Sequence, residues 1–302
     1  MIGVVLALLG SQFPEPTIHL LEYDAKQPLN LTEKLVEKRA RAQVLQIEFD
    51  SPKGGRVTGF MVTPAGSGGK TTFAGVVFGH WGGGNATEFL PEAIRYAEAG
   101  AVSVMIDYPW VRPYPWYRKI FADTTPEQDL ATEAQAIIDL RRAFDVLMAR
   151  SDVDPKRIAY VGHSFGAQFG AVLAGVDRRM TTAILIAGTP TMGAIYLESQ
   201  QPAIAELRKA AGEDAMKHEV EVMSQLDGIR FVPRASPISL FFQFARYEPS
   251  FSHERMNEYA AAASAPKKVA WYSTGHDMNA PEAAKDRATW LAEKIGLKPA
   301  AR

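Results

Sequence analysis

Apolar residues first alternate with polar ones along this chain and then gather in short runs. Residues 43–49 alternate with period two, a Ser-Pro-Lys-Gly-Gly turn fills 51–55, and apolar residues return over 57–62. This pattern predicts an antiparallel hairpin at the edge of a sheet. Near-continuous apolar strands that alternate with helices are typical of a parallel sheet covered on both faces. Six such apolar runs follow the hairpin, with helical patterns between them: 74–78, 101–106, 158–161, 183–187, 238–242 and 269–272.

Helical spacing marks two segments in particular. Residues 30–41 are charged, with three apolar residues at helical spacing, which predicts a surface helix ahead of the hairpin. The sequence Thr-Pro-Glu-Gln at 125–128 provides an N-cap, a proline in the first turn and the glutamine of a capping box. Apolar residues then recur on one face as far as Leu147, so a long amphipathic helix is predicted there.

Two segments depart from the alternation of strands and helices. Residues 108–123 are dense in Pro, Trp and Tyr, and residues 190–237 form a long, helical, mixed-charge insertion after the sixth predicted strand, which we interpret as a cap. The predicted fold class is α/β, with one mostly parallel eight-stranded sheet flanked by helices. The predicted organisation is an N-terminal segment and helix (1–39), a core (40–189 and 238–302) and a helical cap (190–237).

The net charge and the residue composition limit the classes of partner that we expect. The 302 residues carry a formal net charge of −1 and a pI near 6.6, so no general field attracts nucleic acid or an anionic membrane. Small molecules are the expected partners, and no oligomeric state is predicted. The absence of cysteine excludes a disulfide framework, a thiolate metal site and a cysteine nucleophile.

The N-terminal residues bear on the compartment. Ile2–Leu9 are apolar, but no Lys or Arg precedes Lys26, so the positively charged start of a secretory signal is missing. The stretch is also too short to span a bilayer. We therefore expect a cytoplasmic protein, with export through a trimmed signal peptide as the alternative.

The strongest chemical signal is Gly-His-Ser-Phe-Gly at 162–166, directly after the apolar strand pattern at 157–161. A strand that turns at once into a helix raises the residue at its apex above the sheet. The positions two before and two after the apex lie where strand and helix pass too closely for a side chain. Gly162 and Gly166 meet this requirement, which makes Ser164 the predicted nucleophile.

A serine nucleophile needs a base, and the base needs a carboxylate to orient it. His276 follows the last predicted strand and is the best placed of the six histidines, whereas His163 should point away from the serine. Glu248 lies a few residues beyond the strand pattern at 238–242 and is the predicted acid. The alternatives are that Glu248 forms a surface ion pair with Arg246 or Arg255 while Asp277 or a cap carboxylate orients the histidine, or that His276 is a structural loop residue.

The third requirement is a pair of N–H groups aimed at the oxygen that becomes negative in the tetrahedral intermediate. Phe165, after the nucleophile, provides one. The sequence His80-Trp-Gly-Gly-Gly follows the first parallel strand and has the composition of an oxyanion loop, so Gly82 is the second predicted donor, with Gly83 as its alternate. The alternatives for this loop are a flexible turn or a metal ligand at His80. No second ligand lies at metal-binding spacing, and phosphate-binding glycine motifs are missing, so neither a metal nor a nucleotide is predicted.

Ser164, Glu248 and His276 in this chain order, with the His80 loop ahead of them, make the sequence resemble the α/β-hydrolase superfamily. Within it, the chain looks most like the dienelactone-hydrolase-like and acetyl-esterase-like branch, over residues 40–296. It departs from dienelactone hydrolases, which use a cysteine nucleophile. The family corner usually reads Gly-x-x-Asp, where this chain has Ala245 and Glu248.

The resemblance implies ester hydrolysis through a covalent acyl-enzyme, without a cofactor. We expect small or medium carboxylic esters as substrates. A peptidase or thioesterase would share the same triad, acyl transfer or perhydrolysis would need another acceptor than water, and a non-catalytic ligand-binding protein is the alternative of another class. Aromatic residues after the second parallel strand and in the oxyanion loop are predicted to line the substrate pocket, the alternative being that they pack the cap onto the core: Trp81, Tyr108, Trp110 and Trp116.

Overall fold

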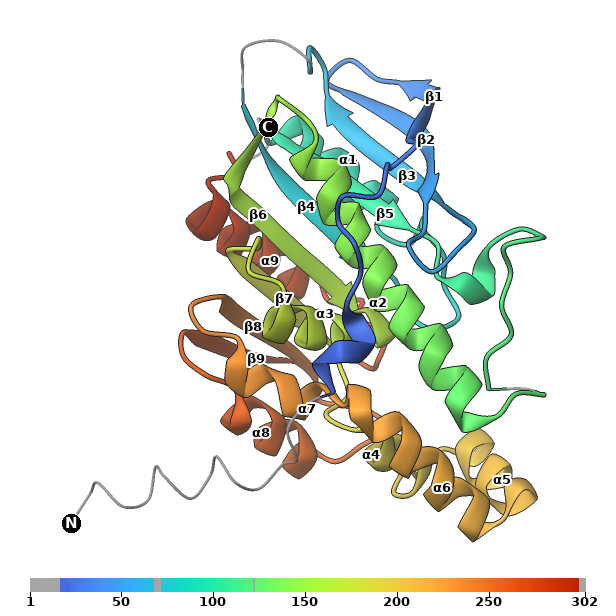
Figure 1. Ribbon diagram of the computed structural model, residues 1–302. Coiled ribbons are helices and arrows are strands. Elements are labelled where there is room, and N and C mark those ends of the chain that lie inside the picture. The colour runs from blue at the N-terminus through green and yellow to red at the C-terminus, as the bar shows by residue number, and fades with distance from the viewer. Residues whose placement is uncertain (1–16, 68–71, 122, 299–302) are drawn as a thin grey trace.

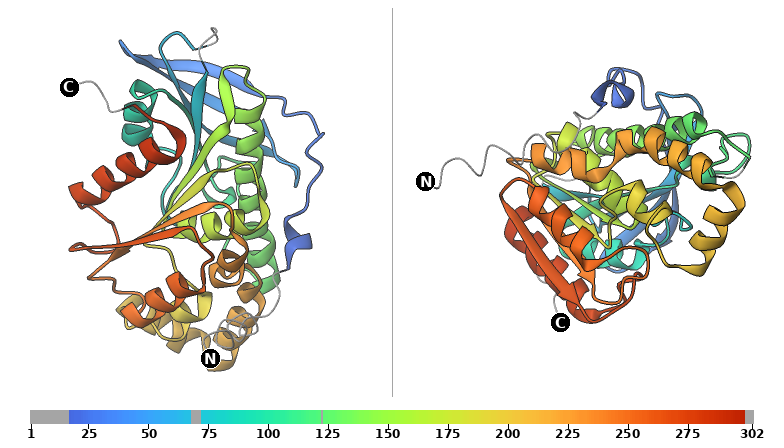
Figure 2. Two further views of the ribbon diagram at one scale, coloured as in Figure 1. Left: turned by 90° about the vertical axis from the view of Figure 1, so that its left-hand side faces the viewer. Right: turned by 90° about the horizontal axis from the view of Figure 1, so that it is seen from below.

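A twisted sheet runs through the centre of the molecule, with helices on both faces (Figures 1 and 2). The computed structural model describes residues 17–67, 72–121 and 123–298. The apolar run Ile2–Leu9, on which the prediction about a signal peptide depends, lies outside these residues. None of the helices within the described ranges is long and apolar enough to cross a bilayer.

The sheet formed by the described residues has nine strands in the order β1-β2-β3-β5-β4-β6-β7-β8-β9. The pairs from β1 to β5 in this order are antiparallel, and all pairs from β5 to β9 are parallel. The strands are β1 (Thr32–Lys38), β2 (Ala42–Asp50), β3 (Arg56–Pro64), β4 (Phe73–Gly79), β5 (Ala101–Ile106), β6 (Val153–His163), β7 (Thr182–Ile186), β8 (Ser239–Ala245) and β9 (Lys267–Tyr272).

Helices cover the two faces as separate layers, which Figure 2 shows with the sheet nearly edge-on between them. The α-helices are α1 (Leu90–Glu98), α2 (Pro126–Met148), α3 (Phe165–Val176), α4 (Met192–Tyr196), α5 (Pro202–Ala211), α6 (Glu213–Met223), α7 (Gly228–Phe231), α8 (His253–Ala262) and α9 (Pro281–Ile295). The 3-10 helices are η2 (Ile18–Leu21), η3 (Pro109–Val111), η4 (Ser224–Leu226) and η5 (Val232–Arg234).

Each layer has its own apolar core. Successive side chains of a strand point to opposite faces, so Val77 of β4 belongs to the core under α2 and α3, whereas its neighbours Val76 and Phe78 belong to the core under α1 and α9. The predicted parallel sheet with both faces covered is therefore confirmed. It directs the carboxyl ends of β4, β6, β8 and β9 toward one end of the molecule.

Helix α2 begins as its sequence predicts. The Thr125 side chain accepts a hydrogen bond from the Gln128 N–H, and the Gln128 side chain accepts one from the Thr125 N–H, which completes a capping box. Buried apolar residues such as Ile137 and Phe144 then hold the helix against the sheet.

The predicted surface helix at 30–41 is wrong. These residues contain β1, which pairs antiparallel with β2 and has a bulge between Leu35 and Glu37. All seven residues of β1 are exposed, so a helix here would bury no apolar face. An extended chain instead forms hydrogen bonds with the backbone of β2. The Glu and Lys side chains of β1 suit an exposed edge strand because charge discourages further pairing.

This additional strand corrects the predicted number of strands from eight to nine, and the helical insertion therefore follows β7, the seventh strand, instead of the sixth. The insertion contains α4, α5 and α6, which lie together beyond the carboxyl end of the sheet (Figure 1). The division of the chain into core and cap stays a prediction.

A buried ion pair joins α1 to α9. The Arg287 guanidinium donates hydrogen bonds to both oxygens of Glu92, at 2.8 and 3.1 Å, and to Gln243 of β8 at 3.0 Å. Burial by itself would raise the pKa of Glu92, but the hydrogen bonds and charge of Arg287 outweigh it and hold this pKa below its ordinary value. The pair therefore fixes both helices to the same face of the sheet.

Replacing one partner of the Glu92–Arg287 pair should lower the free energy of unfolding more than replacing both. Arg287→Ala leaves the Glu92 carboxylate buried without a counter-charge, so we expect a loss of about 3–5 kcal/mol in the free energy of unfolding. The double variant Glu92→Leu, Arg287→Met should lose less, because no charge stays buried. Urea denaturation measures both; an Arg287→Ala protein as stable as wild type would contradict this role.

Candidate active site

Ser164 lies at the sharp turn between β6 and α3. Its φ of 54° and ψ of −113° are a strained conformation for a residue with a side chain. A Cβ atom at Gly162 would lie 2.2 Å from the Gly166 carbonyl oxygen, and one at Gly166 would lie 2.0 Å from that of Gly79. Both glycines are therefore required by the close approach of β4, β6 and α3.

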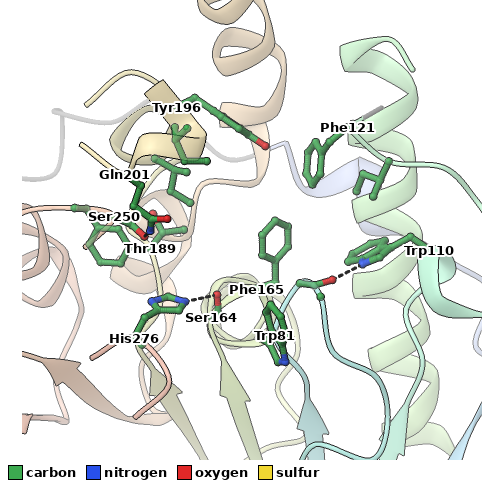
Figure 3. A pocket seen from close by; sticks show the side chains of 17 residues that line it. Trp81, Trp110, Phe121, Ser164, Phe165, Thr189, Tyr196, Gln201, Ser250 and His276 are labelled. Carbon is green, nitrogen blue, oxygen red and sulfur yellow. Dashed lines mark hydrogen bonds between the residues drawn. The ribbon is translucent and has the colours of Figure 1, made fainter. Parts of the chain in front are cut away.

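Three of the predicted site residues meet at this turn. His276 follows β9, and its Nε2 lies 2.8 Å from the Ser164 Oγ (Figure 3). Its Nδ1 lies 2.7 Å from an oxygen of Glu248, which follows β8. The Glu248 side chain is fully buried, whereas that of His276 is 30% exposed. The imidazole therefore connects a buried carboxylate with a hydroxyl at the floor of a cavity.

The second oxygen of Glu248 accepts a hydrogen bond from the Ser250 N–H at 3.0 Å, which fixes the carboxylate plane. Two residues of the alternative assignments, Arg255 and Asp277, have contacts elsewhere. Arg255 forms ion pairs with Glu198 and Glu258. Asp277 accepts a hydrogen bond from the Asn279 side chain.

The two predicted oxyanion donors belong to adjoining loops. Phe165 is the first residue of α3, and Gly82 lies in the loop after β4, which is tied to the turn by a hydrogen bond from the Gly166 N–H to the His80 carbonyl. Within the described residues, neither the Gly82 nor the Phe165 N–H has a hydrogen-bond acceptor, and the same holds for Gly83. Trp110 Nε1 donates to the Gly82 carbonyl at 2.8 Å and so orients the peptide between Gly82 and Gly83 (Figure 3).

His80 is buried beneath this loop, and its surroundings select the neutral ring. Nδ1 lies 2.6 Å from the Trp81 carbonyl, which can only accept, so this nitrogen carries the proton. Nε2 accepts the Tyr108 N–H at 3.3 Å. Burial lowers the pKa of His80 to about 4, so the imidazole is a fixed part of the loop at neutral pH.

A cavity of about 410 Å³ lies above Ser164. Aromatic side chains form much of its wall on the side away from His276 (Figure 3): Trp110, Phe121 and Phe165. Tyr196 of the helical insertion lies above it (Figure 3), and Ile195 of the same helix also lines it. Near His276 the wall is polar, with a hydrogen bond of 2.6 Å from Gln201 Nε2 to the Ser250 hydroxyl.

The predicted pocket residues divide into two groups. Trp81 and Trp110 line the cavity. Tyr108 and Trp116, which were predicted beside them, do not. Tyr108 is fully buried and stacks on His80, with ring centroids 3.7 Å apart, and Trp116 packs against Gly55 in the turn between β2 and β3. Trp116 follows η3 in a loop that passes Gly55 before Phe121 reaches the cavity.

Several lining residues escaped the sequence analysis. Phe121, Gln201 and Ser250 come from loops and from the start of α5, and no spacing pattern connects them with Ser164. Phe121 does fall within the aromatic segment after β5, which was the available signal. Across residues 17–67, 72–121 and 123–298, no group of three or more His, Asp and Glu side chains is arranged to hold a metal ion.

Comparisons with known proteins identify the architecture. An acetyl xylan esterase from Paenibacillus sp. R4 superposes with a TM-score of 0.78 at 20% identity, over 96% of this chain and 99% of its own. Acetyl xylan esterase 1 from Thermoanaerobacterium sp. JW/SL YS485 gives 0.77 at 14% identity, over 95% and 98%. The α/β hydrolase GrgF from Penicillium sp. sh18 gives 0.62 at 14%, over 84% and 99%.

No family model matches this sequence, and no curated protein does. At these identities the structural likeness establishes the fold, which is the α/β-hydrolase fold that the sequence resemblance implied. The closer assignment to a dienelactone-hydrolase-like branch stays a prediction.

Because His80 is buried as a neutral ring, we expect the protein to lose stability as the pH falls. Its folded-state pKa of about 4 lies below the unfolded value of about 6.5, so the unfolded chain binds the proton first as the pH falls. This contribution to the free energy of unfolding is complete above about pH 6.5 and declines by about 3 kcal/mol as the pH falls to about 4.

The comparison with His80→Asn isolates this effect, because titrating carboxylates contribute equally to both proteins. Urea denaturation at several pH values should show that wild-type stability falls more steeply between about pH 6.5 and 4. Equal pH dependence in the two proteins would contradict a buried, neutral His80.

Proposed function

We propose that this protein is a serine carboxylic-ester hydrolase that acts on small to medium esters. The observation that supports this most directly is the chain of contacts from Glu248 through His276 to Ser164 at the floor of an apolar cavity. The arrangement supplies a nucleophile, a base within hydrogen-bond reach and a carboxylate that orients the base.

The chemistry follows from these contacts. His276 Nε2 takes the proton as the Ser164 Oγ attacks the ester carbonyl, and returns it to the leaving alcohol as the tetrahedral intermediate collapses. Glu248 holds the tautomer with its proton on Nδ1 and stabilises the imidazolium. Water then attacks the acyl-enzyme with His276 as base again, which releases the carboxylic acid and the free serine.

The oxyanion is assigned to the N–H groups of Gly82 and Phe165, with Gly83 as the alternate donor. Neither of the two principal groups has a protein acceptor within the described ranges, so each is available to a substrate oxygen. One such donor contributes roughly 3 kcal/mol to the barrier of acyl transfer. The hydrogen bond from Trp110 to the Gly82 carbonyl orients the peptide between Gly82 and Gly83, and therefore the N–H of the alternate donor Gly83.

The cavity supports the proposed substrate class. The leaving alcohol receives its proton from His276 and so lies toward the polar wall of Gln201 and Ser250. The acyl group is then directed to the aromatic wall, where Phe121 and Tyr196 limit its length. The likeness to two proteins named acetyl xylan esterases also favours a short acyl group.

Hydrolysis of p-nitrophenyl esters from acetate to laurate tests this proposal. Wild type should hydrolyse the short esters best. Ser164→Ala and His276→Ala should each lower kcat by about 10⁴-fold or more, because each removes a member of one catalytic unit. Glu248→Gln should lower kcat by about 10⁴-fold at most, because the amide favours the wrong imidazole tautomer.

Asp277→Asn is the matched control, since Asp277 has its hydrogen bond with Asn279 and none with His276. It should keep most of the wild-type activity. Serine-independent turnover would contradict the mechanism. Cleavage of amides or thioesters in preference to esters would instead identify a peptidase or thioesterase, and ligand binding without turnover would identify a binding protein.

The two tryptophans separate substrate selection from packing. Trp110→Ala enlarges the cavity and frees the peptide between Gly82 and Gly83, so kcat should fall and the preferred acyl chain should lengthen. Trp116→Ala removes packing on Gly55 away from the cavity, so thermal stability should fall while the order of preference among esters is kept. Melting temperatures and the same ester series measure both effects. An altered ester preference in Trp116→Ala would contradict its placement.

A further inference from the structure

Glu88 and His163 connect the two loops that carry the reaction. Glu88 lies just before α1, and one oxygen of its carboxylate accepts the Trp81 N–H of the oxyanion loop at 2.7 Å. Its other oxygen lies 2.6 Å from His163 Nδ1. His163 Nε2 lies 2.8 Å from the backbone carbonyl of His276. The proposed mechanism assigns none of its steps to these two side chains.

The partners of this bridge determine how many protons it holds. A backbone carbonyl can only accept, so His163 Nε2 must carry a proton. At 2.6 Å from a carboxyl oxygen, Nδ1 also requires a proton in the contact, because two lone pairs would repel each other at this distance. The imidazole and the carboxyl group therefore hold one proton more than a neutral histidine beside a carboxylate.

We propose that Glu88 and His163 are positioning residues, and that the extra proton on His163 Nδ1 holds the oxyanion loop and the His276 loop in register with Ser164. The effect on turnover rests on the proposed function. The Trp81 N–H stabilises the carboxylate form of Glu88, so we assign the proton to the ring and describe the contact as an imidazolium–carboxylate pair.

The bridge of Glu88 and His163 contacts residues that carry or adjoin the reacting groups. His163 directly precedes Ser164, and its contact with the His276 carbonyl acts on the residue that carries the base. The contact between Glu88 and Trp81 acts on the residue that precedes Gly82. Both side chains are mostly buried, with 10% and 20% of their surfaces exposed for His163 and Glu88. One pair thereby couples the positions of nucleophile, base and oxyanion donor.

Other titratable groups surround the pair. Burial raises the pKa of Tyr108, and the neighbouring Tyr160 and the charge of Glu88 raise it further. Burial also raises the pKa of Tyr160, to which Glu88 adds. The His276 ring lies 5.5 Å from that of His163. Without the extra proton, two lone pairs would meet at the contact between His163 and Glu88, so the two loops should separate and kcat should fall.

Glu88→Gln tests this directly. A glutamine can accept the Trp81 N–H with its oxygen and donate its amide proton to a neutral His163, so all three contacts persist without the extra proton. Glu88→Ala removes the two contacts that Glu88 makes, with Trp81 and with His163. We expect Glu88→Ala to lower kcat by roughly ten- to a hundredfold through misplacement of the reacting groups. Glu88→Gln should recover most of that loss and should extend activity to more alkaline pH than wild type.

Nitrogen NMR of the imidazole rings provides a readout that does not depend on activity. His163, assigned by comparison with His163→Gln, should have protons on both ring nitrogens in wild type near neutral pH and on Nε2 alone in Glu88→Gln. Ser164→Ala should keep the wild-type His163 signals. If wild type showed these signals but hydrolysed no ester, the proposed function would be refuted and the bridge would stand.

Glu37→Gln, on the exposed strand β1, removes the same charge from a remote site and should keep the wild-type pH profile. A singly protonated His163 in wild type, or equal alkaline limbs in wild type and Glu88→Gln, would overturn the proposal. Equal losses of kcat in Glu88→Ala and Glu88→Gln would overturn it as well, because they would show that the geometry of the bridge is not what matters.

Discussion

The close approach of β4, β6 and α3 is the constraint on which the site depends. The carbonyl groups of Gly79 and Gly166 occupy the space that side chains at Gly166 and Gly162 would need, so this approach is possible only with glycine at both positions. Because the chain passes so tightly, Ser164 is forced into a positive φ and its hydroxyl stands clear of the sheet. The same contact joins the His80 carbonyl to α3 and thereby sets the oxyanion loop beside the nucleophile. Backbone strain, nucleophile exposure and donor placement thus have one physical origin.

The parallel order of the sheet brings the remaining groups to this point. Glu248 and His276 follow the neighbouring strands β8 and β9, two and three strands away from β6. The carboxyl ends of these strands face the same way, so His276, 112 residues from Ser164 in sequence, reaches the serine, and Glu248 reaches His276. The buried Glu92–Arg287 pair and the cores on both faces hold this end of the sheet rigid. Glu248 accepts a second hydrogen bond and His80 is neutral, so the polar groups around the turn have defined roles before a substrate binds.

Local patterns predicted the parts of the molecule that local forces determine. The strand and helix periods and the capping box of α2 depend on neighbours within a few residues, so the sequence contains the information that predicts them. Strand β1 was predicted as a helix because its spacing is helical, whereas the unpaired edge of β2, distant in the chain, decides its conformation. Trp116 was placed at the pocket because it follows a strand end, but the later course of the loop carries it to Gly55. The bridge of Glu88 and His163 joins the loop after β4, the end of β6 and the loop after β9, and no spacing rule relates these segments.

The proposed function requires that Ser164 forms a covalent acyl-enzyme, which mass spectrometry after rapid acid quenching can detect. Wild-type protein is mixed with p-nitrophenyl acetate, quenched during turnover and digested, and the peptide that contains Ser164 is compared with that of His276→Ala and of unreacted protein. We expect the mass of one acetyl group on Ser164 in the wild-type peptide, and a far smaller fraction of acetylated peptide in His276→Ala. Turnover of the ester with an unmodified Ser164, or with the acetyl group on another residue, would contradict it.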